Sequence, residues 1–177
     1  ECALNFSEGR RPEVIDALVA AARGAGAHVL DVAANADHNR TVLTMVGSAE
    51  EVEGAAFAVT AEALKRIDMR QHQGAHPRMG AVDVIPLVPL GEATMDDAVA
   101  LARRLGARLG EELALPVFLY EEAASTPERR NLADVRRGEF EGLARRLAQE
   151  GGQPDFGAAR PHPSGGAVAV GARRFLV

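Results

Sequence analysis

Two histidines, His72 and His76, stand four residues apart in the stretch HQGAHPRMGAVDVIPLVPL at residues 72–90. His76 precedes Pro77, which disfavours helical backbone at the histidine and favours an extended conformation. Since an imidazole has an ordinary pKa of about 6.5, it can take up and return a proton near neutral pH. A histidine on a short rigid loop before a buried strand is therefore a candidate for proton transfer. From the residues alone, a loop histidine that only bonds nearby backbone is the simpler interpretation.

A metal site is the alternative that the same histidines suggest, because ligands four residues apart lie on one face of a helix. Gly74 and Pro77 argue against a helix here, and no Glu completes an HExxH motif. A third ligand would have to come from a distant residue such as His38. We expect no metal, and a metal-dependent hydrolase that uses His72, His76 and His38 is kept as an alternative.

A second candidate site is the loop PDFGAARPHPSGGA at residues 154–167, which is dense in Pro and Gly. Loops of more than about 12 residues without secondary structure are usually functional or disordered. This loop carries Arg160, His162 and Ser164, and the glycines after Ser164 offer backbone N–H groups that a ligand can approach closely. A flat aromatic ligand with carboxylates would suit it, and a plain linker is the alternative.

Polar residues also gather on two expected turns. The segment DHNR at residues 37–40 has the composition of a tight turn, whose side chains could bind a ligand or only face solvent. Asn5, Ser7 and Glu8 lie at the end of the first strand, where they could form a binding loop or begin a helix. We expect the pair Arg136 and Arg137 on a solvated helix face.

Apolar runs and helical periodicity predict an α/β fold. Strands are expected at residues 1–6, 28–33, 41–46, 82–88, 117–121 and 167–177. Helices are expected at 12–23, 48–68 and 94–113, and two short ones, split near Gly138, at 128–148. This order predicts a ferredoxin-like α/β sandwich, extended by a β-α-β unit, with a mixed sheet of about six strands and helices packed on the outside. The length excludes an α/β barrel, and a Rossmann fold lacks its Gly-rich fingerprint.

The composition excludes several classes of function. A chain of 177 residues predicts one domain, and its balance of apolar and charged residues is that of a globular protein. The net charge of −5 provides no basic surface for nucleic acid or an anionic membrane, and no apolar run approaches the roughly 20 residues of a membrane span. The single cysteine, Cys2, fits a reducing cytoplasmic compartment and is expected to be buried.

Several blocks taken together resemble one known family. They are ECALNFSEG, DHNRTV, GAHPRMGAVDVIPLVP, LPVFLYEEAA, PDFG and GARRFL. Over essentially its whole length the chain is similar to the N-terminal subdomain of the formiminotransferase family, the glutamate formimidoyltransferases that occur alone or fused to a cyclodeaminase. HPRMG is the most distinctive block. The resemblance implies one subdomain over residues 1–177, with the family's C-terminal subdomain absent.

The resemblance implies an enzyme, a transferase of one-carbon groups. Family members move a formimino group from N-formimino-L-glutamate to N5 of tetrahydrofolate, in histidine degradation and folate one-carbon metabolism. The family's catalytic histidine corresponds to His76, which can act as a base and then as an acid. Tetrahydrofolate is the implied co-substrate, without a metal. The folate-binding loop corresponds to Gly157, Ala158, Ala159, Arg160, Pro161, His162, Pro163, Ser164, Gly165 and Gly166. Substrate contacts are expected from Asn5, Asp37, Asn39 and Arg40.

Two departures from the family bear on activity. Some relatives carry an acid where this chain has Ala33, so a carboxylate role there is absent or is filled by another residue. Asp37 and Asp31 are candidates for stabilising the amidine charge. The family's substrates lie between this subdomain and the C-terminal one, so we expect weak or no transfer by the chain alone. A homodimer is left open, and so is a catalytically inactive folate-binding paralogue or partner domain.

Overall fold

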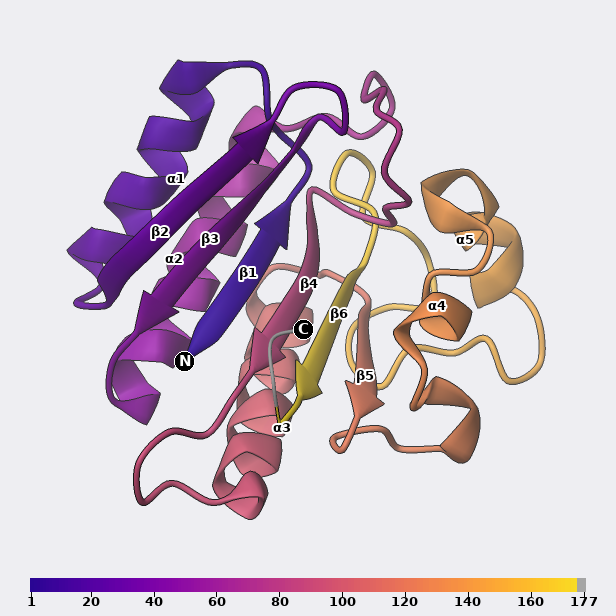
Figure 1. The fold of residues 1–177 in the computed structure, drawn as a ribbon. Helices are drawn as coiled ribbons and strands as arrows, with labels where there is room; N and C mark the ends of the chain where they lie inside the picture. Colours follow the sequence, from indigo (N-terminus) through magenta and orange to yellow (C-terminus); the bar gives the residue numbers. More distant parts are fainter. Residues whose placement is uncertain (175–177) are drawn as a thin grey trace.

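The computed structural model describes residues 1–174 (Figure 1). Its elements, in chain order, are β1 (Cys2–Phe6), α1 (Pro12–Gly24), β2 (His28–Asn35), β3 (Arg40–Val46), α2 (Ala49–Arg66), β4 (Val82–Leu87), α3 (Met95–Glu112), β5 (Val117–Glu121), the 3₁₀ turn η1 (Pro127–Arg129), α4 (Leu132–Val135), α5 (Glu139–Leu147) and β6 (Val168–Ala172). Every expected strand and helix is present. Of the last expected strand, residues 175–177 lie outside the described residues.

The six strands form one sheet in the order β2-β3-β1-β4-β6-β5. The pairs β2–β3, β3–β1 and β1–β4 are antiparallel, whereas β6 runs parallel to both β4 and β5. The first four strands with α1 and α2 therefore form a ferredoxin-like core. The segment from α3 to β6 adds the parallel strands. This confirms the predicted mixed sheet of about six strands.

The helices α1, α2 and α3 lie together on one face of the sheet (Figure 1). α2 begins with a capping box of Ser48 and Glu51, and α3 begins with one of Thr94 and Asp97, so the first free N–H groups of both helices are bonded. The apolar faces of the three helices pack against alternate strand residues in the main hydrophobic core. Cys2 belongs to this core, as predicted, and burial raises the pKa of its thiol to about 12.

The other face of the sheet is covered over only part of its width. α4 and α5 pack on β4, β5 and β6 in a second cluster that includes Phe118 and Tyr120. Within residues 1–174 no helix covers this face of β1, β3 and β2 (Figure 1). Its residues include Asn5, Arg40 and Ala33, because strand partners that lie directly opposite share a face. No helix of the described part of the chain is long and apolar enough to cross a membrane.

Candidate active site

The segment between α2 and β4, which carries both candidate histidines, lies where β1 ends. Ser7, just after β1, donates its backbone N–H to the carbonyl of Ala81 over 2.8 Å. Its hydroxyl donates to the carbonyl of Gly80 over 2.7 Å. These bonds continue the β1–β4 pairing beyond both strands. The segment is therefore held against the sheet and its backbone is fixed on this side.

The loop at residues 157–166 lies against the same segment. Two backbone hydrogen bonds connect them, from Met69 N–H to Ser164 O (2.7 Å) and from Ala81 N–H to Gly165 O (3.0 Å), and Ala167, directly after the loop, donates its N–H to Met79 O (3.1 Å). A Cβ on Gly80 would lie 2.0 Å from the carbonyl oxygen of Ala167, so only glycine permits this approach. The two stretches nominated separately from the sequence are thus neighbours in space.

The turn between β2 and β3 forms the third side of the site. Ala75 donates its N–H to the carbonyl of Asp37 over 3.2 Å. Asn39 has a φ of 48°, and its side-chain amide accepts from Gly9 N–H (2.9 Å) and donates to the carbonyl of Gln73 (3.0 Å). Both ends of this amide are therefore bonded within the fold. Its predicted contact with substrate stays a prediction, and so does that of the exposed Asp37.

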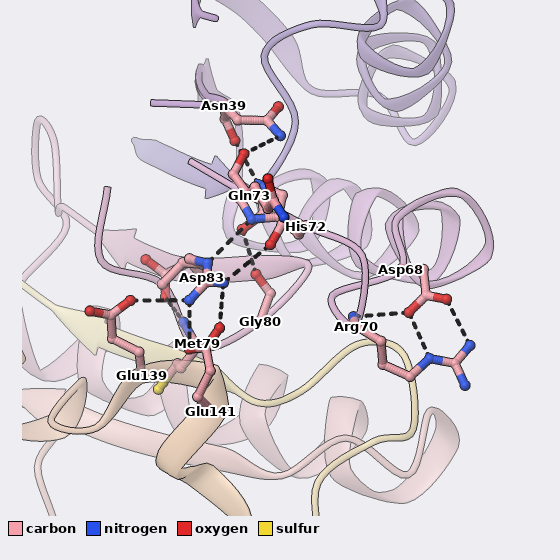
Figure 2. Close-up of polar contacts among 12 residues, drawn as sticks. Asn39, Asp68, Arg70, His72, Gln73, Met79, Gly80, Asp83, Glu139 and Glu141 are labelled. Carbon is pink, nitrogen blue, oxygen red and sulfur yellow. Dashed lines mark hydrogen bonds and ion pairs between the residues drawn. The ribbon is translucent and has the colours of Figure 1, made fainter. Parts of the chain in front are cut away.

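His72 has both ring nitrogens engaged (Figure 2). Nε2–H donates to the carbonyl of Asn39 over 3.0 Å, and Nδ1 accepts from Nε of Arg78 over 3.2 Å. Arg78 is itself held by Glu139 and Glu141 of α5. Burial lowers the pKa of His72, which favours the neutral ring that this bonding requires. His72 therefore connects the loop to α5, and a metal site with His38 and His76 would have to break its bonds.

His76 is half-buried and differs from His72 in having a free ring nitrogen. Its Nδ1 lies 2.6 Å from the carbonyl oxygen of Pro77, so Nδ1 carries the proton and donates it there. Within residues 1–174 no group bonds Nε2, which is left with a lone pair. Burial, followed by the positive charge of Arg40, lowers the pKa of His76. The imidazole is thus a neutral base at pH 7, and the ring of His38 lies 5.8 Å from it, centroid to centroid.

We expect the substitution Arg40→Gln to raise the pKa of His76. Removing a positive charge near the ring makes the imidazolium form less costly. Titration of the His76 Cε1–H resonance by NMR measures the change. Arg137→Gln is the matched control, because Arg137 is 80% exposed and pairs with Asp134 instead. An unchanged His76 pKa in Arg40→Gln would contradict the electrostatic account.

Arg136 is the functional candidate that the sequence reasoning missed. It was expected on a solvated helix face, and that expectation is wrong, because its side chain is only 17% exposed and pairs with Asp83. Asp83 is 2% exposed and also accepts the N–H of Met79 over 2.9 Å. Arg137 does face solvent, as expected. The available signal was Asp83 itself, a charged residue within an apolar strand, which needs a partner when buried.

The remaining predicted residues of the sheet lie on its uncovered face. Arg40 donates from Nε to Oδ1 of Asn5 over 2.8 Å, so the two predicted contact residues are joined on the uncovered face. Asp31, proposed as a replacement for the acid missing at Ala33, is exposed on β2 opposite Thr44. It shares the face of Ala33 and Arg40 because alternate residues of a strand point the same way. A carboxylate role for Asp31 stays a prediction.

The predicted folate loop has a partly ordered and a partly open half. Residues 157–160 are exposed, whereas Gly165 and Gly166 are buried. Nδ1 of His162 accepts from Gly165 N–H over 3.0 Å, which closes the second half into a tight turn. A hollow of about 470 Å³ lies between Pro161, residues 69–73 and α5. This volume falls in the usual range for small-molecule sites.

The fold and the site together define a ferredoxin-like α/β domain with a half-buried imidazole at the end of its sheet. Residues 1–173 match the family described as the formiminotransferase domain, N-terminal subdomain. The chain belongs to this family, which confirms the resemblance seen in its motifs.

Curated relatives extend the same match. The chain is 47% identical over 178 residues to the glutamate formimidoyltransferase of Streptococcus pyogenes serotype M1, matching the whole chain and 60% of that relative. It is 48% identical over 178 residues to the formimidoyltransferase-cyclodeaminase of Rattus norvegicus, again over the whole chain but only 33% of the relative. The chain therefore spans between about a third and three fifths of the length of these relatives.

Proposed function

We propose that this chain is the N-terminal part of a glutamate formimidoyltransferase, which moves a formimino group from N-formimino-L-glutamate to N5 of tetrahydrofolate. The observation that carries the proposal is the hydrogen-bonded contact between the His76 segment and the loop at 157–166. In the proposal this loop binds the folate, so the acceptor amine would lie close to a free imidazole nitrogen. The names of the relatives support the reaction class.

The proposed chemistry needs one proton acceptor that becomes a donor. N5 attacks the formimino carbon, a C–N bond forms, and Nε2 of His76 takes the N5 proton. The imidazolium then returns the proton to the glutamate nitrogen as the old C–N bond breaks, which releases glutamate. The hydrogen bond from Nδ1–H to Pro77 fixes the orientation of the ring during both steps. Asp31 or Asp37 would balance the positive charge of the amidine.

Tetrahydrofolate is the proposed co-substrate, held by residues 157–166, of which Pro161 lines the adjoining hollow. Asn5 and Arg40 lie on the neighbouring sheet face and would contact the donor. This arrangement leaves one side of the proposed site open within residues 1–174. We propose that a C-terminal subdomain, present in the longer relatives, closes that side over the uncovered face of β1, β3 and β2. A cytoplasmic enzyme fits the single buried cysteine.

We expect weak or no formimino transfer from residues 1–177 alone and full transfer from the full-length protein. Half of a site that binds two substrates between subdomains loses much of the positioning on which the rate depends. Initial rates measured with both substrates, for the isolated chain and the full-length protein at equal concentration, test this. Equal rates would contradict the two-subdomain site. Circular dichroism of the isolated chain controls for unfolding.

A further inference from the structure

Arg40 and Arg136 approach the same part of the uncovered sheet face from two sides. Arg40 belongs to β3 and is bonded to Asn5 of β1. Asn5 pairs directly with Val84 of β4, and Asp83, the residue before Val84, holds Arg136. The chain of contacts therefore runs across three adjacent strands. It places two guanidinium groups on either side of β1, at the end of the sheet that carries His76.

The charges in this group do not balance. Two half-buried guanidinium groups face one carboxylate, that of Asp83. Burial, and then the positive charge of Arg136, lower the pKa of Arg40, as expected for like charges held close together. Within residues 1–174, Nε of Arg136 is buried without a hydrogen-bond partner. Such a donor is costly unless something accepts from it, and a bound anion would both accept and neutralise the excess charge.

We propose that Arg136, with Arg40, forms the subsite that binds a glutamyl carboxylate of a substrate. The inference rests on the proposed function for the identity of this ligand. Planar guanidinium groups favour carboxylates because they can donate two parallel hydrogen bonds. Both proposed substrates supply the chemistry, since N-formimino-L-glutamate is a glutamate derivative and folates carry a glutamyl tail. The anion would lie beside His76. The two arginines would then bind the carboxylate, and His76 would transfer the proton.

Asp83 is the positioning residue of this subsite. One of its oxygens accepts from Arg136 and the other accepts from the N–H of Met79, which belongs to the HPRMG block of His76. A single buried carboxylate therefore fixes both the carboxylate-binding arginine and the backbone behind the proposed base. This explains why a charged residue lies within a strand that is otherwise apolar.

The test is equilibrium binding to the full-length protein, by calorimetry, of three ligands: glutarate, N-formimino-L-glutamate and 5-formyltetrahydrofolate. In Arg136→Gln we expect the affinity for glutarate, and for whichever substrate places its glutamyl carboxylate here, to fall roughly tenfold to 100-fold. Arg137→Gln, which removes the same charge one residue away, should bind as the wild type does. Raised ionic strength should weaken glutarate binding in the wild type.

A second variant guards against misfolding, because Arg136→Gln leaves the Asp83 carboxylate buried without its partner. Asp83→Asn combined with Arg136→Gln removes both charges and should restore stability without restoring the affinity. Wild-type affinity for all three ligands in this folded double variant would overturn the inference. If glutarate binding depends on Arg136 but the full-length protein transfers no formimino group, the inference stands and the proposed function fails. If Arg136→Gln transfers the formimino group with an unchanged KM for both substrates, the proposed function stands and the inference fails.

Discussion

Replacing His76 by alanine is expected to slow formimino transfer in the full-length protein by about 10²–10⁴-fold, the usual contribution of a positioned acid–base group. The free Nε2 is the reason for the large effect. His72 cannot take over, because both of its nitrogens are bonded within the fold. The loss should lie in kcat, since the imidazole acts on the reacting atoms and binds neither substrate in the proposal. Steady-state kinetics with both substrates measures it.

His28→Ala is the matched control for this substitution. His28 is exposed at the first residue of β2 and pairs with Val46, at the opposite end of the strand from the turn at 36–39. It should leave the rate unchanged. The affinity for 5-formyltetrahydrofolate should be nearly the same in His76→Ala and in the wild type. A His76→Ala protein that retains folate binding and most of its rate would show that His76 is not the base.

Replacing Gly80 by alanine should lower the free energy of unfolding by about 2–3 kcal/mol. The added Cβ would lie 2.0 Å from the carbonyl oxygen of Ala167 and 2.8 Å from that of Gly165. Backbone atoms on both sides prevent an easy adjustment. The contact between the His76 segment and the loop at 157–166 must therefore open, and folate binding should weaken together with stability. Urea unfolding of wild type and variant measures the change.

Gly142→Ala provides the comparison for Gly80→Ala. Gly142 lies inside α5, and a Cβ there would meet nothing within 4 Å. Alanine should stabilise the protein by about 0.5–1 kcal/mol through its higher helix propensity. If Gly80→Ala unfolds at the same urea concentration as the wild type and binds folate equally well, the close approach of the two loops is not required.

The fold could be predicted from the sequence because its signals are local. Apolar runs marked the strands, and the Ser48–Glu51 pair marked the start of α2. The split of the 128–148 region near Gly138 was also predictable, because glycine readily adopts a positive φ. In the structure Gly138 has a φ of 87°. The relation of the two candidate loops could not be read in this way. It depends on backbone bonds between residues far apart in the chain, which no local pattern encodes.

The candidate site was predictable only in part for the same reason. The motif identified His76 and the loop at 157–166, but the spacing of His72 and His76 suggested a metal as well as a base. Only the partners of the two rings separate their roles, one with both nitrogens bonded and one with a free nitrogen. Arg136 and Arg137 look alike in sequence. They differ because one meets the buried Asp83 and the other does not.

The most direct test of the central claim is the initial rate at which the full-length protein forms 5-formiminotetrahydrofolate. Our account predicts turnover that requires both N-formimino-L-glutamate and tetrahydrofolate, with glutamate released in equal amount. No product from a folded protein that still binds 5-formyltetrahydrofolate would contradict it, and would identify a folate-binding protein without this transferase activity.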